Sequence, residues 1–308
     1  MSSFTEGIWS GVPMPWSTGD VLDSSALERT LDRCVETGSD GIYIGGTTGE
    51  FHSMTEDQFL DVAETFMKVM KRHPDFPVQI GCGGPSLSHV LDRIDVAVSV
   101  GCSVVQVPLP GWLPLTDEEV VFYYDAMIKA HPDVQICVYD TAAAGRTIGS
   151  DVWMRLLGLF PQITGAKITT IDAELVRRIR NVRPEFVLLG GEDNLADLWS
   201  NGVRSMAAWI SYAFPSIITD LFHELKEGMT DNIAAGKRRL LIIKNDIKGP
   251  ARLQGYRDGM MDRLMGLASG FLEPVYQRVL DPWKSIDPKD VEAARGRIVE
   301  FLGEEYLF

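Results

Sequence analysis

The stretch ITGAKITT, residues 163–170, places a lysine in a short run that otherwise has the composition of a buried strand. An ammonium group is among the groups least often fully buried without a partner. Lys167 therefore extends its charged end to solvent, pairs with an acid such as Glu192, or provides an amine for chemistry. The pattern of the surrounding chain bears on which of these applies.

Eight runs of this kind alternate with longer segments of helical periodicity. Eight strand–helix units in roughly 225 residues predict a (β/α)8 barrel, a fold of about 250 residues. The expected strands are Gly7–Met14, Gly41–Ile44, Val78–Gly81, Val104–Val107, Gln135–Tyr139, Ile163–Lys167, Phe186–Gly190 and Arg204–Trp209. Capping-box spacing predicts helix starts at Ser25–Glu28, Thr55–Gln58 and Thr116–Glu119.

The strand pattern ends near Thr230, and the remaining chain has helical periodicity. We expect residues 1–228 to form the barrel and residues 229–308 to form a C-terminal helical extension packed on it. A doubly wound open sheet is the main alternative, but it usually has a glycine-rich phosphate turn after its first strand. The GCGG segment at residues 81–84 lacks the GxGxxG spacing of such a turn.

Composition excludes several classes of protein. A net charge of −14 disfavours nucleic-acid binding, which needs clustered lysine and arginine. No apolar run reaches membrane-spanning length, and the first residues, MSSFTEGIWSG, lack a signal-peptide pattern, so we expect a cytoplasmic protein. The four cysteines lack CxxC spacing, and the five histidines lack HExxH spacing, so we expect neither a metal nor a cofactor.

Polar residues follow several of the expected strands. Lys167 ends the sixth strand and Tyr139 the fifth, Thr47 and Thr48 follow the second, and the GGED segment at residues 190–193 follows the seventh. In a (β/α)8 barrel the C-terminal strand ends and the loops after them form the active site. The sequence therefore predicts that these polar groups meet at one mouth of the barrel.

Lys167 at such a mouth is a candidate nucleophile. Desolvation lowers the pKa of a lysine, which leaves more free amine to attack a carbonyl carbon. The protonated Schiff base that results is an electron sink for breaking or forming an adjacent bond. From the strand alone, a lysine that extends to solvent or pairs with Glu192 is the more common outcome.

The other polar residues suggest specific roles. Tyr139 would relay a proton, although a tyrosine at a strand end is common without any such role. Thr47, Thr48 and Gly46 would bind a carboxylate through hydroxyl and backbone N–H groups, or form an ordinary turn. Arg146 would hold a second carboxylate, or be a surface arginine.

GGTTGE at residues 45–50, a tyrosine ending strand five and GAKIT at residues 165–169 resemble the dihydrodipicolinate synthase / N-acetylneuraminate lyase family. The resemblance spans nearly the whole chain. It implies a class I lyase that forms a lysine Schiff base, built on a (β/α)8 barrel with a C-terminal helical extension and usually homotetrameric. It implies that Lys167 is the Schiff-base lysine and Tyr139 the proton relay, and it places substrate contacts at Thr47, Thr48, Thr169 and Gly191. Gly165 and Thr169 occupy the positions of the glycine and threonine that flank the lysine in the family.

The chain departs from the family pattern at three positions. YDTA at residues 139–142 replaces Tyr-Asn-x-Pro, and Arg146 lies two positions further from the tyrosine than the synthase arginine. LPGW at residues 109–112 lacks the tyrosine that synthases lend to a neighbouring subunit's relay; its tryptophan resembles the hydratase-aldolase branch that acts on arylidene pyruvates. The acids at positions 192 and 193 would bind substrate hydroxyls or hold their loop.

The sequence thus predicts a lyase or aldolase that condenses Lys167 with pyruvate or another 2-oxo acid and makes or breaks a C–C bond. A dehydratase or deaminase that uses the same imine is the alternative. A non-catalytic 2-oxo acid binding protein is the alternative of another class. We expect a homo-oligomer, tetramer or dimer, with no nucleic-acid or membrane partner.

Overall fold

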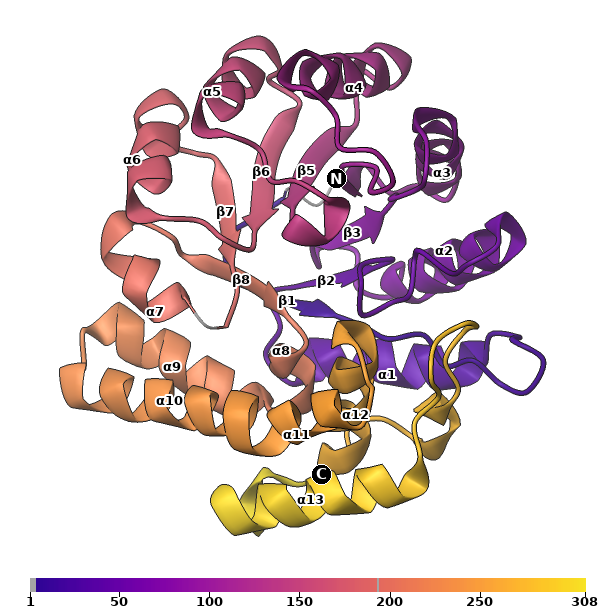
Figure 1. Cartoon of the computed structure of the whole chain (residues 1–308), viewed down its shortest axis with the longest axis vertical. Helices are drawn as coiled ribbons and strands as arrows, with labels where there is room; N and C mark the ends of the chain where they lie inside the picture. Colours follow the sequence, from indigo (N-terminus) through magenta and orange to yellow (C-terminus); the bar gives the residue numbers. More distant parts are fainter. Residues whose placement is uncertain (1–3, 193) are drawn as a thin grey trace.

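The computed structural model describes residues 4–192 and 194–308. Eight parallel strands close into a barrel in the order β1 to β8, with helices between them along the chain (Figure 1). The predicted (β/α)8 fold is therefore confirmed. The strands are β1 (Ile8–Gly11), β2 (Gly41–Ile44), β3 (Val78–Gly81), β4 (Val104–Pro108), β5 (Gln135–Asp140), β6 (Ile163–Ile168), β7 (Val187–Gly190) and β8 (Ser205–Ala208).

The strand predictions differ from the structure mainly at strand ends. β2 and β3 have the predicted bounds, and the other six overlap their predictions. The largest difference is at β1, which ends at Gly11 rather than at Met14. Proline has no backbone N–H to donate to a neighbouring strand, and Pro13 and Pro15 lie just beyond the observed end.

Helices surround the barrel. Those of the barrel repeat are α1 (Ser24–Glu36), α2 (Glu56–Met70), α3 (Leu87–Ser99), α4 (Asp117–Ala130), α5 (Ser150–Leu159), α6 (Ala173–Val182), α7 (Leu195–Leu198), α8 (Ile210–Ala213) and α9 (Pro215–Glu227). Short 3₁₀ turns are η1 (Ala142–Ala144), η2 (Trp199–Asn201), η4 (Pro274–Gln277) and η5 (Glu304–Tyr306).

Two of the three predicted helix starts are correct. Thr55 and Thr116 form complete capping boxes at the starts of α2 and α4. The prediction at Ser25 is wrong, because Asp23 is the N-cap of α1 and its side chain accepts a hydrogen bond from the backbone N–H of Ala26. Aspartate is as good an N-cap as serine, so the helix begins two residues earlier.

The core has two parts. Most buried apolar side chains lie between the strands and the surrounding helices. A smaller cluster lies among the strands and includes Trp9, Tyr43, Cys137 and Leu189. Gly165 of β6 belongs to this packing, because a Cβ atom there would lie 2.1 Å from the ring of Phe4. Gly165, two residues before Lys167, thus makes room for the Phe4 ring.

The C-terminal residues form helices that lie along one side of the barrel, near α8 and α9 (Figure 1). They comprise α10 (Thr230–Ile242), a π-helical turn η3 (Ile243–Lys248), α11 (Gly249–Leu253), α12 (Asp258–Ser269) and α13 (Pro288–Phe301). The backbone of α12 passes close to the loop after β2, since a Cβ atom on Gly259 would lie 2.6 Å from the carbonyl oxygen of Thr47.

Candidate active site

Lys167 and Tyr139 lie side by side at the C-terminal ends of β6 and β5. Their Cα atoms are paired in the strand register, which places both side chains at the same level of the barrel. The Lys167 Nζ atom is 3.5 Å from the Tyr43 hydroxyl oxygen and 5.0 Å from the centre of the Tyr139 ring. The amine therefore lies between two tyrosines, one from the neighbouring strand and one from β2.

The pKa of Lys167 differs from the sequence-based expectation. Burial lowers the pKa of the amine, but the phenolic oxygens of Tyr43 and Tyr139 and the carboxylate of Glu192 outweigh it, and the pKa is raised above its ordinary value. The aromatic rings add to this effect, because a ring face attracts a cation. The expected lowering of the pKa by desolvation is the largest single contribution, but the combined effect of Tyr43, Tyr139 and Glu192 exceeds it and favours the ammonium form in the free site.

The loop after β2 brings two threonines to the same place. The hydroxyl oxygens of Thr47 and Tyr139 are 3.4 Å apart. The hydroxyl of Thr48 donates to Asp262 of α12 at 2.7 Å. Within the described residues, the backbone N–H groups of Thr47 and Thr48 donate to no backbone carbonyl oxygen.

These residues line a cavity of about 1030 Å³. Its walls include almost all the residues that the sequence placed at the site: Lys167, Tyr139, Thr47, Thr48, Gly46, Thr169, Gly191 and Glu192. Not all of their polar groups face a ligand. The Gly191 N–H donates to the Asn194 side chain at 3.1 Å, and the Thr169 hydroxyl donates to the carbonyl oxygen of Asp140 at 3.3 Å.

Arg146 is a correction to the sequence analysis. It is not among the residues that line the cavity. Its guanidinium donates to the carbonyl oxygen of Leu115 and pairs with Asp117 at 2.7 Å. These contacts fasten the loop after β5 to the start of α4, so the fork of donors is used within the protein. Trp112 also lies outside the cavity lining, and its side chain is 89% exposed.

Sequence reasoning missed many residues of the cavity wall, and four of them bear on the chemistry of the site. Tyr43 is one, and the others are Trp209, Lys248 and Asp262. The Lys248 Nζ atom is 2.7 Å from Asp262 Oδ1 and 4.4 Å from the centre of the Trp209 ring. The Trp209 indole N–H donates to Glu192 at 2.9 Å. These contacts form a continuous polar chain from Thr48 to Glu192.

Burial acts against the charges of Lys248 and Asp262, and their pairing favours them. Burial lowers the pKa of the Lys248 amine, but Asp262 and Glu192 outweigh it and raise that pKa above its ordinary value. Burial raises the pKa of the Asp262 carboxyl, against the opposing effect of Lys248 and of the hydrogen bond from Thr48. The ammonium of Lys248 is thus retained at neutral pH.

Glu50, at the end of the GGTTGE segment, anchors the loop after β2 that carries Thr47 and Thr48, called the threonine loop below. It adopts a left-handed backbone conformation with φ of 61°. Its buried carboxylate accepts hydrogen bonds from Arg263 of α12 and, at 2.8 Å, from the backbone N–H of Leu280. The same arginine donates to the carbonyl oxygen of Met14 at 2.9 Å. The C-terminal helices therefore hold the loop that carries Thr47 and Thr48.

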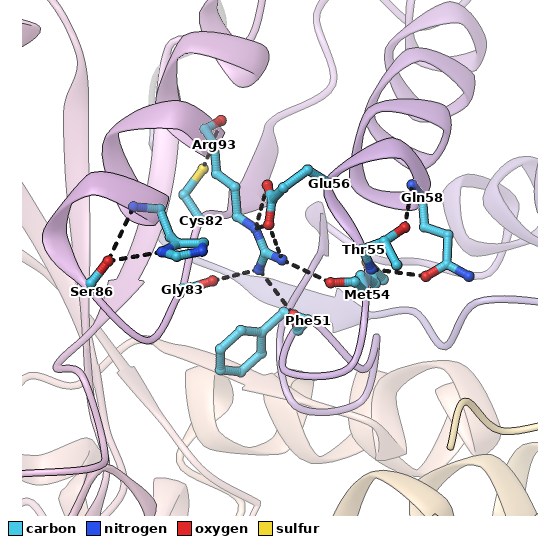
Figure 2. Close-up of polar contacts among 10 residues, drawn as sticks. Phe51, Met54, Thr55, Glu56, Gln58, Cys82, Gly83, Ser86 and Arg93 are labelled. Atoms are coloured by element: carbon cyan, nitrogen blue, oxygen red, sulfur yellow. Dashed lines mark hydrogen bonds and ion pairs between the residues drawn. The ribbon is translucent and has the colours of Figure 1, made fainter. Parts of the chain in front are cut away.

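Arg93 is a second buried arginine that holds the loop after β2. Figure 2 shows that the Arg93 guanidinium of α3 points at the carbonyl oxygens of Phe51, Met54 and Gly83, with donor–acceptor distances of 2.9, 3.2 and 2.5 Å. It also pairs with Glu56 at 3.0 Å. Arg93 is 3% exposed. It joins the loop after β2 to the loop after β3.

No cluster of histidine, cysteine and carboxylate side chains suited to a metal ion occurs in the ranges 4–192 and 194–308. Within those same ranges, no helix is both long and apolar enough to cross a bilayer.

A closed (β/α)8 barrel with a lysine between two tyrosines at its C-terminal mouth suits the chemistry of a lyase. Comparison with known proteins agrees: residues 5–276 match the model of the Dihydrodipicolinate synthetase family, and the chain belongs to that family. Proteins of this family similar to the chain are named lyases and aldolases, and the chain is an enzyme of the lyase class.

Two curated relatives and one solved structure illustrate the similarity. The chain is 26% identical to a 4-hydroxy-tetrahydrodipicolinate synthase of Hydrogenobaculum sp. over 70% of this chain and 73% of the relative. It is 28% identical to the trans-2'-carboxybenzalpyruvate hydratase-aldolase of Nocardioides sp., covering 74% and 72%. YagE of E. coli K12, solved in complex with pyruvate, shares the fold with a TM-score of 0.84 and 19% identity, covering 97% and 99%.

Proposed function

We propose that this protein is a Schiff-base-forming lyase that condenses Lys167 with a 2-oxo acid and makes or breaks a carbon–carbon bond in the bound imine. The observation that carries the proposal is the position of the Lys167 amine, between two tyrosines on the wall of the large cavity at the barrel mouth. An ammonium that pairs only with surface acids would not need two aromatic neighbours.

The first step joins the amine to the ketone. Lys167 loses a proton, its nitrogen bonds to C2 of the 2-oxo acid, and the ketone oxygen takes up protons and leaves as water. The raised pKa of Lys167 means that a base must accept the first proton. The Tyr43 hydroxyl, 3.5 Å from the amine, is positioned to pass that proton to the departing ketone oxygen.

The second step uses the imine as an electron sink. When the C3–C4 bond breaks, its electron pair moves to C3 and into the iminium, while the C4 hydroxyl gives up its proton and becomes a carbonyl. Tyr139 would carry this proton, with Thr47 as its neighbour at 3.4 Å. The reverse sequence forms the bond.

The carboxylate of the 2-oxo acid would bind at the threonine loop. The backbone N–H groups of Thr47 and Thr48 supply two donors there. The hydroxyl proton of Thr48 is already donated to Asp262, so this side chain contributes through its position rather than as a donor. This assignment differs from the expectation that both threonine hydroxyls contact the carboxylate.

Loss of water or ammonia from the same imine is the second candidate. The relative named as a hydratase-aldolase supports it, since that protein combines both reactions. Loss of water requires an acid at the departing oxygen, and Tyr139 has the reach for this role from its place beside Lys167. A binding protein without activity receives no support, because the chain belongs to a family of lyases.

Turnover of a panel of 2-oxo acids, read by mass spectrometry, tests the proposal. The panel contains pyruvate with aldehyde partners, hydroxylated 2-oxo acids and arylidene pyruvates. We expect turnover by the wild-type protein and at least a thousandfold loss in Lys167→Ala, because the covalent route is removed. Lys129→Ala, at an exposed lysine of α4, is the control and should retain full rate. Undiminished turnover by Lys167→Ala would refute the proposal.

We further propose pyruvate as the 2-oxo component, a cytoplasmic location and a homo-oligomeric state. The four cysteines are unpaired and buried, which agrees with a reducing compartment. Trp112 and Leu113, 89% and 72% exposed, are suited to contact with a second subunit.

A further inference from the structure

Lys248 is held against the cavity wall by two contacts. It ends the π-helical turn η3, and π-helical turns occur frequently at functional sites. Its Nζ atom donates to Asp262 Oδ1 at 2.7 Å and lies over the Trp209 ring. Its side chain is 15% exposed. The ammonium is thus fixed in position and withdrawn from bulk water.

The ammonium of Lys248 has donors to spare. An ammonium carries three N–H donors, and Asp262 is the one hydrogen-bond acceptor that Lys248 has among the described residues. An ion pair this deeply placed gives little net stability, since apolar side chains of the same volume often serve as well. A charged pair on the wall of a cavity is better explained by a ligand oxygen that takes the remaining donors.

The cavity has space beyond the reacting end of the substrate. A volume of about 1030 Å³ is at the upper end of ligand pockets, which hold molecules far larger than pyruvate. One wall is supplied by residues 240–253 of the C-terminal helices, among them Leu240, Ile243 and Leu253. A 2-oxo acid anchored at Lys167 and Thr47 would extend its chain toward this wall.

The charges near Lys248 favour a neutral group. Lys248 faces Asp262 directly, and Glu192 acts electrostatically on Lys248, Asp262 and Lys167. Asp258 also acts on Lys248, so three carboxylates act on its ammonium, while other positive charges of the cavity wall come from Lys167, Lys244 and Arg252. A second carboxylate on the substrate would add a further negative charge beside these acids. A hydroxyl accepts a hydrogen bond from Lys248 without adding a charge.

We propose that Lys248 determines substrate specificity by donating a hydrogen bond to a hydroxyl oxygen on the substrate chain beyond C4, so that the enzyme selects 2-oxo acids with a hydroxylated far end over those without one. The inference rests on the proposed function for the orientation of the substrate, with its 2-oxo end at Lys167. It adds a residue of the C-terminal helices to the substrate site.

Equilibrium binding to a Lys167→Met variant tests the inference without covalent chemistry. Three ligands differ only at C5, the far end: 2-oxopentanoate, 5-hydroxy-2-oxopentanoate and 2-oxoglutarate. We expect the hydroxylated acid to bind about ten- to a hundredfold more tightly than 2-oxopentanoate, the range of a hydrogen bond to a charged donor, and more tightly than 2-oxoglutarate. Titration calorimetry measures all three affinities.

Two further variants isolate the ammonium. Lys248→Met alone would leave Asp262 unpaired, so it is combined with Asp262→Asn, which retains an oxygen acceptor for Thr48. Asp262→Asn by itself is the matched control. Both are made in the Lys167→Met background. We expect the preference for the hydroxyl to persist in the control and to vanish in the combined variant.

Three results would overturn the inference: no preference among the ligands, a preference that survives removal of the ammonium, or tightest binding of 2-oxoglutarate that depends on Lys248. Reduction with borohydride separates this inference from the proposed function. If the wild-type protein forms no reducible imine while the Lys248-dependent preference is observed, the lyase mechanism fails and the assignment of Lys248 stands.

Discussion

At the scale of single residues, the protonation of Lys167 is the feature that most constrains the chemistry. The amine has its pKa raised by Tyr43, Tyr139 and Glu192 in spite of burial. Only the free amine attacks a carbonyl, so at neutral pH a small fraction of the protein is ready to react. At pH values below the pKa of Lys167, the fraction of free amine rises about tenfold for each unit by which the pH increases.

Tyr43→Phe should therefore lower the pH at which Lys167 begins to react, even though the proton path through the Tyr43 hydroxyl is lost. The change removes the phenolic oxygen that most strongly raises the pKa of Lys167, so that pKa falls. The pH profile of imine capture, measured with pyruvate and cyanoborohydride, should move to lower pH by about one pH unit. Tyr306→Phe, at a tyrosine in the last turn of the chain, is the control. A shift to higher pH would contradict the account.

Lys167 and Tyr139 were predictable from sequence because each ends a strand, where a barrel places its reacting groups. The other cavity residues were not predictable in this way. Tyr43 lies inside a four-residue buried strand, GIYI, whose pattern does not show which side chain faces the amine. Lys248 and Asp262 lie at least 200 residues after Thr48 along the chain, and no local signal connects them.

At the scale of elements, two buried arginines hold the loop after β2. Arg263 comes from α12 and Arg93 from α3, and each donates to backbone carbonyl oxygens of separate segments. The loop therefore has its shape imposed by neighbouring helices. This explains why Glu50 can keep a left-handed conformation that is rare for a residue with a side chain.

Arg93→Met should destabilise the protein by about 3–5 kcal/mol, because buried carbonyl oxygens lose their donor. The measurement is the free energy of unfolding in urea. Arg29→Met is the matched control: Arg29 pairs with Glu273 at 2.7 Å, but its side chain is 57% exposed, so its loss should change the free energy of unfolding much less than Arg93→Met does. Equal effects of the two substitutions would contradict the role of Arg93.

The elements themselves were largely predictable from sequence. The alternation of short β-branched runs with helical periods specifies strand and helix locally, and Thr55 and Thr116 mark helix starts through their own hydrogen bonds. The contacts that decide loop shape could not be predicted, because Arg93 and Arg146 look alike as isolated arginines on the chain. Arg93 is buried and donates to carbonyl oxygens of two loops, whereas Arg146 pairs with Asp117 away from the cavity.

At the scale of the whole molecule, the C-terminal helices complete the site. They supply Lys248 and Asp262 to the cavity wall and Arg263 to the threonine loop. The backbone of Gly259 lies against that of Thr47. A barrel without these helices would leave Glu50 as a buried carboxylate with no guanidinium partner.

A chain that ends at Gly228 should therefore fail to fold cooperatively. Near-ultraviolet circular dichroism during thermal unfolding is the measurement, and we expect a broad, weak transition in place of a sharp one. We propose that the barrel ends and the extension begins between residues 228 and 229. A sharp transition together with retained imine formation would show that residues 1–228 are an independent domain.

Reductive trapping tests the central claim most directly. Wild-type protein is incubated with pyruvate and borohydride, digested, and mapped by peptide mass spectrometry. The account predicts one stable adduct of reduced pyruvate, on the peptide that contains Lys167, and none in Lys167→Ala. No adduct on the wild-type protein, or an adduct that persists on another lysine after Lys167 is replaced, would contradict it.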